Sequence, residues 1–210
     1  KGRIVILHSG WYEDFLGASV RTPDRDPAIV RREIERIQRH ERMLVADGVA
    51  VVKVHLHIGP ELQRKRIRRH FKDKTTRWRV TAEDHWQASH YLRVERALEH
   101  CLKVTDQPSA PWHVIDGTDR QHRALEVGRV LLAGIEGRLS EPARGRTRSA
   151  VAPARRRAAA IRLPTTHSGP PVAEEDYDRA LEEVQGRLAL LSRRRKFVKH
   201  SVVVVLEGMD

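Results

Sequence analysis

The sequence predicts an α/β fold of three layers, in which helices cover both faces of a parallel sheet. Residues 3–7 form a short apolar run of strand length, and residues 49–58 form a β-rich run bounded by Gly48 and Gly59-Pro60. A segment with helical spacing lies between the two runs. A strand, a short helical crossover and a second strand in this order are typical of a parallel sheet with helices packed on it. An apolar content of 40% is enough to form the core of such a domain.

The first long helix is predicted from its ends and from its apolar spacing. Asp26 provides an N-cap, and Pro27 follows it at the first helical position. Gly48 after Asp47 is a suitable stop. The apolar residues that recur at helical spacing between these ends are Val30, Ile34, Ile37 and Leu44. Further along the chain we expect helices at residues 60–71, 82–104 and 119–138, and a third strand at residues 112–115.

The chain changes character at residue 140. Prolines, small residues and arginines fill residues 140–171, a composition typical of a solvated linker. Residues 174–196 return to helical spacing with one apolar stripe, and they lead into a strand at residues 202–206. We therefore expect one domain at residues 1–139, a basic Pro/Ala/Arg linker at residues 140–171, and the start of a second domain at residues 172–210.

The end of the sequence, from Val202 to Asp210, is its most informative part. A buried strand that runs into Gly208 resembles the beginning of a phosphate-binding loop, because the backbone N–H groups of such a turn can surround an anion. The Gly-Lys-Ser/Thr end that would complete the loop is not in the sequence, which begins at Lys1 rather than at Met. We therefore interpret the chain as an internal fragment that ends as a second domain begins.

Cations are concentrated between Gln63 and Arg79. This segment holds nine arginines and lysines against a single acid, Asp73. Residues 65, 68, 69 and 72 share one helix face, where like charges repel by roughly 0.2–0.5 kcal/mol per pair, so this face is suited to an anion. Arginine forks bind phosphate oxygens in pairs, and lysines add point charge. The phosphate-binding candidates are Lys65, Arg66, Arg69, Lys72, Arg77 and Arg79. The alternative is a basic face that is only solvated.

The other chemistry-bearing residues are expected to have structural roles. The net charge of +12 indicates a negatively charged partner. The single cysteine, Cys101, excludes an internal disulfide and lies in a helical pattern typical of an inert thiol. His55 and His57 lie on one face of a strand without an obvious third metal ligand. Four tryptophans could stack on bases, but core packing is their commoner role: Trp11, Trp78, Trp86 and Trp112. We expect the linker arginines to be solvated rather than bound to nucleic acid.

Five segments, in order along the chain, resemble the type 2 polyphosphate kinase family. They are residues 4–12, Lys53-Val-His-Leu-His-Ile58, residues 66–84 with Asp73, Trp78 and Arg79, Ala110-Pro-Trp112, and residues 177–210. The resemblance covers nearly the whole chain except the linker. Glu207-Gly-Met-Asp210, which follows a nearly complete first copy, is similar to the phosphate-binding loop of the family's two-domain members, which include polyphosphate:AMP phosphotransferases.

The resemblance implies a P-loop kinase-like fold with a degenerate first domain. In active relatives the first strand ends in Phe-Asp-Arg-Ser-Trp-Tyr, where Asp assists magnesium and phosphate handling. Here His8 stands at the Asp position and Ser9 at the Arg position, and a neutral imidazole is a poor ligand for Mg²⁺. The family's lid motif Asp-Pro-x-Lys reads Asp73-Lys74-Thr75-Thr76, and its Arg-Leu-x-x-Arg reads Arg66-Ile67-Arg68-Arg69-His70. The resemblance therefore leaves this domain a structural role or polyphosphate binding through its remaining cations.

For the parent protein, the resemblance implies transfer of a phosphoryl group from inorganic polyphosphate to a nucleotide, with AMP as the expected acceptor and ADP as the product. Asp210 would be the catalytic aspartate of the second domain, and Gly208 would let the backbone approach phosphate. Mg²⁺ is the expected cofactor, although we assign no metal ligand within the chain itself. We expect the 210-residue chain alone to be inactive.

We also expect a cytoplasmic protein with no membrane and no nucleic acid among its partners, and we include a homo-oligomer among the assemblies considered.

Two other classes of function stay open at this point. A nucleotide kinase of the P-loop fold would share the basic segment but would be indifferent to polyphosphate as a donor. A non-catalytic polyanion-binding module would use residues 63–79 and the linker, and it would bind without turnover.

Overall fold

The computed structural model describes residues 3–8, 10–140, 163, 173–195, 197 and 200–208. The expectations made for Ser9, for Asp210 and for almost all of the linker lie outside these residues. Among the described helices, none is long and apolar enough to cross a membrane.

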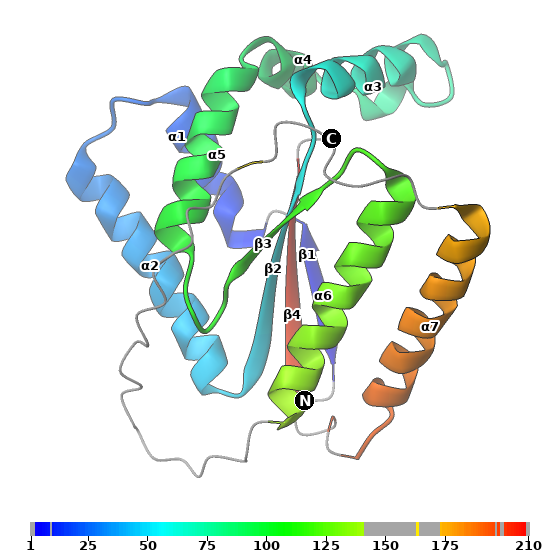
Figure 1. The fold of residues 1–210 in the computed structure, drawn as a ribbon. Helices are drawn as coiled ribbons and strands as arrows, with labels where there is room; N and C mark the ends of the chain where they lie inside the picture. Colours follow the sequence, from blue (N-terminus) through cyan, green and yellow to red (C-terminus); the bar gives the residue numbers. More distant parts are fainter. Residues whose placement is uncertain are drawn as a thin grey trace.

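Four strands form one sheet in the order β1-β4-β2-β3 (Figure 1). The strands are β1 (Ile4–His8), β2 (Val49–His57), β3 (Trp112–Asp116) and β4 (Ser201–Gly208). Every neighbouring pair is parallel, so the carboxyl ends of the strands meet at one edge of the sheet. The parallel sheet expected from the sequence is confirmed.

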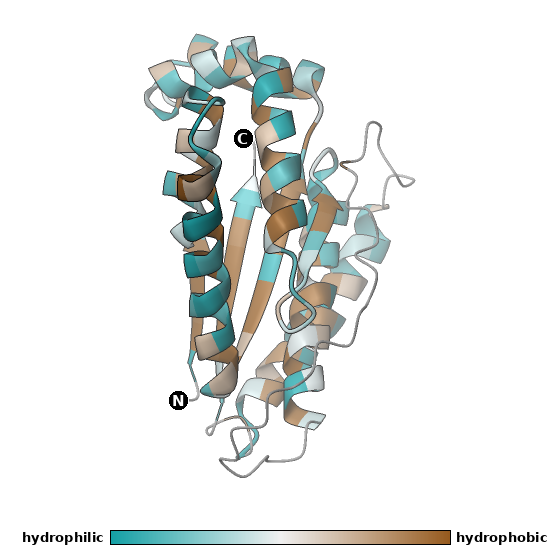
Figure 2. Cartoon of the chain, turned by 90° about the vertical axis from the view of Figure 1, so that its left-hand side faces the viewer, coloured by the Kyte–Doolittle hydropathy of each residue, from teal (hydrophilic) through white to brown (hydrophobic). Residues whose placement is uncertain are grey.

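Helices cover both faces of this sheet (Figure 1). One face carries α1 (Glu13–Arg21), α2 (Pro27–Ala46) and α5 (Tyr91–Thr105), and the other carries α6 (Arg120–Ser140) and α7 (Glu174–Ser192). Along β4, Val205 faces the first core whereas Val202 and Val204 face the second, because successive strand residues point to opposite faces. Figure 2 shows hydrophobic residues concentrated on the strands and mixed hydropathy on the surrounding helices. The three-layer α/β fold is confirmed.

The ends of α2 follow from local chemistry, as the sequence predicts. The side chain of Asp26 accepts a hydrogen bond from the backbone N–H of Ala28 at 2.8 Å, and Pro27 occupies the first turn, where its missing N–H costs nothing. Gly48 after the helix has φ +88°, a conformation that other residues rarely adopt. The chain can therefore turn at once into β2.

The helical stretch expected at residues 82–104 is interrupted. The structure has α4 (Ala82–Ser89), a break at His90, and then α5. The hydroxyl of Ser89 donates to the carbonyl of Trp86 at 2.7 Å, and Nδ1 of His90 lies 2.9 Å from the same oxygen. The backbone N–H of His90 still makes the last helical bond of α4, to this same carbonyl at 3.1 Å. His90 itself then leaves the helical conformation, with φ −114° and ψ 26°, so one expected helix becomes two.

Three further elements complete the described chain: η1 (Gly10–Tyr12), α3 (Pro60–Lys72) and η2 (Arg77–Arg79). The segment η1–α1 lies between β1 and α2, where the sequence analysis assigned no helix. α3, η2 and α4 follow β2 and lie beyond the carboxyl ends of the strands (Figure 1).

Residues 174–208 complete the sheet that the first part of the chain forms. β4 pairs with β1 on one side and with β2 on the other, and α7 packs on α6. At Gly128 of α6, an added Cβ would lie 2.6 Å from Cγ1 of Val184 in α7, so the two helices approach closely because residue 128 has no side chain. Within the described residues there is one sheet, because the apolar strand Val202–Leu206 fills its centre. The domain boundaries in a longer chain stay a prediction.

Candidate functional site

The carboxyl edge of the sheet brings together residues that are far apart in sequence. His8 pairs with Leu206, Leu56 with Gly208, and His57 with Asp116, so four strand ends lie side by side. Ligands of open α/β sheets bind at this edge, where the loops after the strands converge. It is therefore the candidate site.

The basic helix α3 begins directly after β2, at this edge. Gln63 and Ile67 are buried, which turns the opposite side of the helix to solvent. That side carries Lys65, Arg69 and Lys72, all exposed. Among the described acids, none lies within ion-pair distance of these three cations. The positive charge of this face is therefore not neutralised by the described acids. Its binding of phosphate stays a prediction.

Arg66 differs from its neighbours because it is half-buried and engaged with the protein. Its Nη2 donates to the carbonyl oxygens of Gly117 at 2.9 Å and Thr118 at 3.3 Å. The N–H of Gly117 in turn donates to the carbonyl of His57 at 2.7 Å. Arg66 therefore ties α3 to the loop after β3, and this contact fixes the helix over the strand ends. Its predicted contact with phosphate is not tested by this arrangement.

Arg77 and Arg79 lie in η2 rather than on α3. Nε of Arg77 donates to the carbonyl of Phe71 at 2.8 Å, and its guanidinium lies 4.9 Å from the centre of the Phe71 ring. The Arg79 guanidinium lies 5.3 Å from the centre of the Trp78 ring. Both cations thus belong to a separate basic turn that follows α3, and they do not share its exposed face.

The strand ends themselves carry the predicted loop residues. His8 is exposed at the end of β1, and Gly208 is partly buried at the end of β4. An added Cβ at Gly208 would lie 3.4 Å from both Cβ and the carbonyl oxygen of Leu56, so the two strands are closely packed at this point. Ser9 and Asp210 lie outside the described residues.

Metal ligands do not gather within the part of the chain that the structure describes. No group of three or more His, Cys, Asp or Glu residues there could hold a metal ion. Asp116 at the end of β3 is buried, and one of its oxygens accepts from the N–H of Thr118 at 2.8 Å. These donors do not form a protein cage for Mg²⁺, an ion that usually takes one or two carboxylates together with substrate phosphates.

His55 and His57 both lie in the sheet interior, and their ring centres are 5.7 Å apart. Burial, together with the nearby His57, lowers the pKa of His55 to about 3, so His55 is neutral at ordinary pH. Nε2 of His57 lies 3.9 Å from the carboxylate of Glu95 and 3.5 Å from the hydroxyl of Tyr91. The hydroxyl of Tyr91 also donates to the carbonyl of Ile58 at 2.8 Å.

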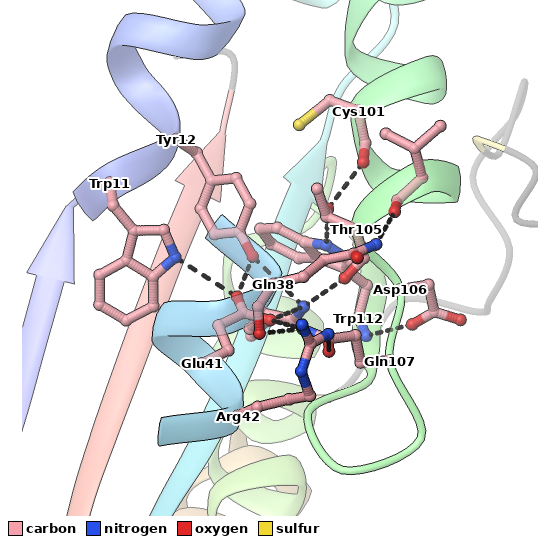
Figure 3. A network of polar contacts seen from close by, with 12 residues as sticks. Trp11, Tyr12, Gln38, Glu41, Arg42, Cys101, Thr105, Asp106, Gln107 and Trp112 are labelled. Atoms are coloured by element: carbon pink, nitrogen blue, oxygen red, sulfur yellow. Dashed lines mark hydrogen bonds and ion pairs between the residues drawn. The ribbon is translucent and has the colours of Figure 1, made fainter. Parts of the chain in front are cut away.

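Sequence reasoning missed a buried polar network behind the site (Figure 3). Nζ of Lys53 lies 3.0 Å from Oε2 of Glu41, and it also donates to the carbonyl of Thr105 at 2.8 Å. The hydroxyl of Tyr12 donates to Oε1 of Glu41, and Nε2 of Gln107 donates to Oε2 at 2.7 Å. A signal was present, because a lysine between valines in a buried strand must find a partner inside the protein.

The network joins segments that carry the motifs resembling the kinase family. Tyr12 follows β1, Lys53 lies in β2, and Trp112 begins β3. The Lys53 ammonium lies 5.1 Å from the centre of the Trp112 ring. Burial raises the pKa of Tyr12, and so does the neighbouring Glu41 carboxylate, which keeps the phenol protonated as a donor. These motif residues therefore hold the fold together, and they do not line the strand ends.

A hollow along the first half of α2 is a second concave region. It is lined by residues between Arg25 and Gln38. None of the strand-end residues lines it, so it is separate from the candidate site.

Comparison with known proteins gives a consistent result. Residues 1–142 match the family model described as Polyphosphate kinase 2. Across its whole length the chain is 32% identical to a polyphosphate:AMP phosphotransferase of Pseudomonas aeruginosa, and 30% identical to one of Pseudomonas syringae pv. tomato. In each case it spans 42% of the relative's length. It is also 30% identical to an AMP/ADP-polyphosphate phosphotransferase of Meiothermus ruber, over 65% of this chain and 51% of that protein.

A solved structure agrees with these matches. The crystal structure of polyphosphate kinase 2 from Arthrobacter aurescens TC1 superimposes with a TM-score of 0.56 and 27% identity, covering 60% of this chain and 44% of that one. The P-loop kinase-like fold implied by the sequence resemblance is thereby confirmed. With a family match over residues 1–142 and strand ends arranged as in this fold, the chain belongs to the polyphosphate kinase 2 family.

Proposed function

We propose that the protein containing this chain transfers a phosphoryl group from inorganic polyphosphate to AMP, giving ADP. The observation that carries the proposal is the 32% identity over the whole chain to a polyphosphate:AMP phosphotransferase, including the segments on both sides of the linker. The chain spans less than half the length of that relative, so the activity is proposed for the protein as a whole.

The basic face of α3 supports this proposal through its charge. Lys65, Arg69 and Lys72 are exposed, and they have no ion-pair partner among the described acids. Phosphoryl transfer depends mainly on positioning and on neutralising phosphate charge, and such cations perform both tasks. We assign polyphosphate binding to this face.

Catalysis is assigned to the loop after β4 and not to the end of β1. At the end of β1, His8 offers an imidazole where active relatives of the family carry Asp. At the end of β4, Gly208 lets the backbone approach phosphate, and Asp210, two residues further along the sequence, is the proposed catalytic carboxylate. Mg²⁺ is the proposed cofactor, supplying charge neutralisation on the substrate phosphates. We place the reaction in the cytoplasm.

The experiment compares ADP formation by the full-length protein and by the 210-residue chain, each supplied with AMP, polyphosphate and Mg²⁺. We expect the full-length protein to form ADP and the isolated chain to form none. ADP formation from ATP, with indifference to polyphosphate, would instead identify a nucleotide kinase. Turnover by the isolated chain would refute the assignment of catalysis to the second domain.

Polyphosphate binding by the chain is a second candidate function in its own right, favoured by the unneutralised face of α3. The triple variant Lys65→Gln, Arg69→Gln, Lys72→Gln is expected to weaken polyphosphate binding by about tenfold, because three exposed ionic contacts are lost. Its matched control removes three exposed arginines of α2 with the same change in net charge: Arg31→Gln, Arg32→Gln and Arg36→Gln. Equal weakening by both triple variants would show that only net charge matters.

A further inference from the structure

A large aromatic side chain is exposed in the basic turn after α3. Trp78 exposes 75% of its surface, and Phe71 at the end of α3 exposes 46%. By contrast, Trp112 is buried and Trp86 stacks on the ring of His90 at 4.4 Å. A tryptophan side chain has a large apolar surface whose burial stabilises a fold or a complex. Its exposure at this position therefore points to a ligand that covers the ring.

Hydrogen bonds fix the exposed indole in place. Nε1 of Trp78 donates to the carbonyl of Thr75 at 2.9 Å. Thr75 is held in turn by Asp73, whose Oδ1 accepts from the backbone N–H at 2.8 Å and from the hydroxyl at 2.7 Å. The bonds from Thr75 lower the pKa of Asp73, so this carboxylate stays ionised as an acceptor. The ring is therefore presented in one orientation before any ligand arrives, which reduces the entropy that binding must overcome.

Cations lie in the same turn as this ring. The Arg79 guanidinium lies 5.3 Å from its centre, and Lys74 and Arg77 are exposed in the same turn. Asp73 is the single acid between Gln63 and Arg79, and its Oδ1 is already taken by Thr75. A fixed aromatic face beside positive charge is complementary to an aromatic base that carries phosphate.

We propose that Trp78 is a stacking platform for the base of a nucleotide, whose phosphate is bound by Arg79, Arg77 and Lys74. This proposal rests on the proposed function, because the nucleotide is the acceptor of the proposed phosphoryl transfer. Inorganic polyphosphate has phosphates but no ring, so it gains from the cations and not from the indole. Trp78 is therefore the residue of this turn that lets it bind a nucleotide in preference to polyphosphate.

The test is calorimetric titration of the 210-residue chain with three probes: AMP, ribose 5-phosphate and inorganic tripolyphosphate. The variants are Trp78→Leu, which removes the aromatic face, and Trp78→Phe, which keeps one. Trp86→Leu is the matched control, because this second indole already stacks on His90 and lies 5.1 Å from the guanidinium of Arg21. Circular dichroism confirms that each variant is folded.

We expect Trp78→Leu to weaken AMP binding by about tenfold, the usual contribution of one stacked base, and to leave ribose 5-phosphate and tripolyphosphate unchanged. Trp78→Phe should recover most of the AMP affinity, and Trp86→Leu should have none of these effects. Unchanged AMP binding in Trp78→Leu, equal loss for AMP and tripolyphosphate, or no AMP binding by the unmodified chain would each overturn the proposal. These results are independent of turnover: a protein without phosphoryl transfer can still show the Trp78-dependent preference for AMP.

Discussion

The ammonium group of Lys53 lies 3.0 Å from the carboxylate of Glu41, and both side chains are completely buried. The pair joins β2 to α2, and the hydroxyl of Tyr12 donates to the same carboxylate. Burial lowers the pKa of Lys53, whereas Glu41 acts in the opposite direction. Because each charge is expensive to bury alone, the pair specifies how α2 lies on the sheet.

Removing one partner of this pair should destabilise the fold strongly. We expect Glu41→Gln to lower the free energy of unfolding by about 3 kcal/mol, because Lys53 is left buried without a counter-charge. Urea unfolding followed by circular dichroism measures the change. Glu35→Gln, an exposed acid of the same helix, is the control and should change stability by less than about 0.5 kcal/mol. The double variant Glu41→Leu, Lys53→Met should recover most of the loss, and equal effects of Glu41→Gln and Glu35→Gln would contradict this account.

The contact between α6 and α7 depends on the absence of a side chain at position 128. A Cβ there would lie 2.6 Å from Cγ1 of Val184, so we expect Gly128→Ala to cost about 1–3 kcal/mol by overpacking. The second change Val184→Ala should restore stability by making room. Gly137→Ala in the same helix has no atom within 4 Å of its Cβ and should be neutral or stabilising. Thermal unfolding distinguishes these cases, and a stable Gly128→Ala single variant would show that α7 does not pack on α6 in solution.

Arg66 should control how firmly α3 is held over the strand ends. In Arg66→Met the bonds to the carbonyls of Gly117 and Thr118 are lost. We expect amide hydrogen exchange in residues 60–72 to accelerate by about tenfold, corresponding to roughly 1.4 kcal/mol of local stability. Lys65→Met, which removes an exposed cation of the same helix, is the control. Equal protection of α3 in both variants would mean that Arg66 does not fix this helix.

Acid should weaken the fold through His55. Its pKa is lowered to about 3 in the folded protein, so between pH 6.5 and pH 3 the unfolded chain binds a proton there that the folded chain does not. The free energy of unfolding therefore falls as the pH drops below 6.5, and His55 contributes about 2 kcal/mol of this loss by pH 5. Urea unfolding at pH 7.5 and pH 5 should show a smaller pH-dependent loss in His55→Leu. The same loss in both proteins would exclude His55 as a source of the pH dependence.

Local sequence signals predicted those parts of the fold that local interactions decide. Asp26, Pro27 and Gly48 mark the ends of α2 because caps and positive φ angles act on the residues next to them. The strands β1, β2 and β4 were predicted from runs of consecutive apolar residues in the sequence. The helix α1 and the break at His90 were missed, because α1 is short and the break is confined to one residue with a helix on each side of it.

The candidate site was predictable as a set of residue types but not as an arrangement. The sequence located the concentration of cations between Gln63 and Arg79, and it could not separate their roles. The structure engages Arg66 with the loop after β3, leaves Lys65 and Arg69 on an exposed face, and puts Arg79 beside Trp78. The difference between Arg66 and the exposed cations of α3 arises from which side of this helix is buried, at Gln63 and Ile67, and that side is set by contacts distant in sequence.

The sequence by itself determined most of the strands and helices, that the strands run parallel, and where along the chain the cations are concentrated. Periodicity, caps and charge are properties of neighbouring residues, so they can be read along the chain. Only the tertiary structure decided that Ser201–Gly208 lies between β1 and β2, and that Lys53 meets Glu41 in the core. Strand order and buried pairing depend on burying apolar surface between segments far apart in sequence, and no local pattern specifies which segments will meet.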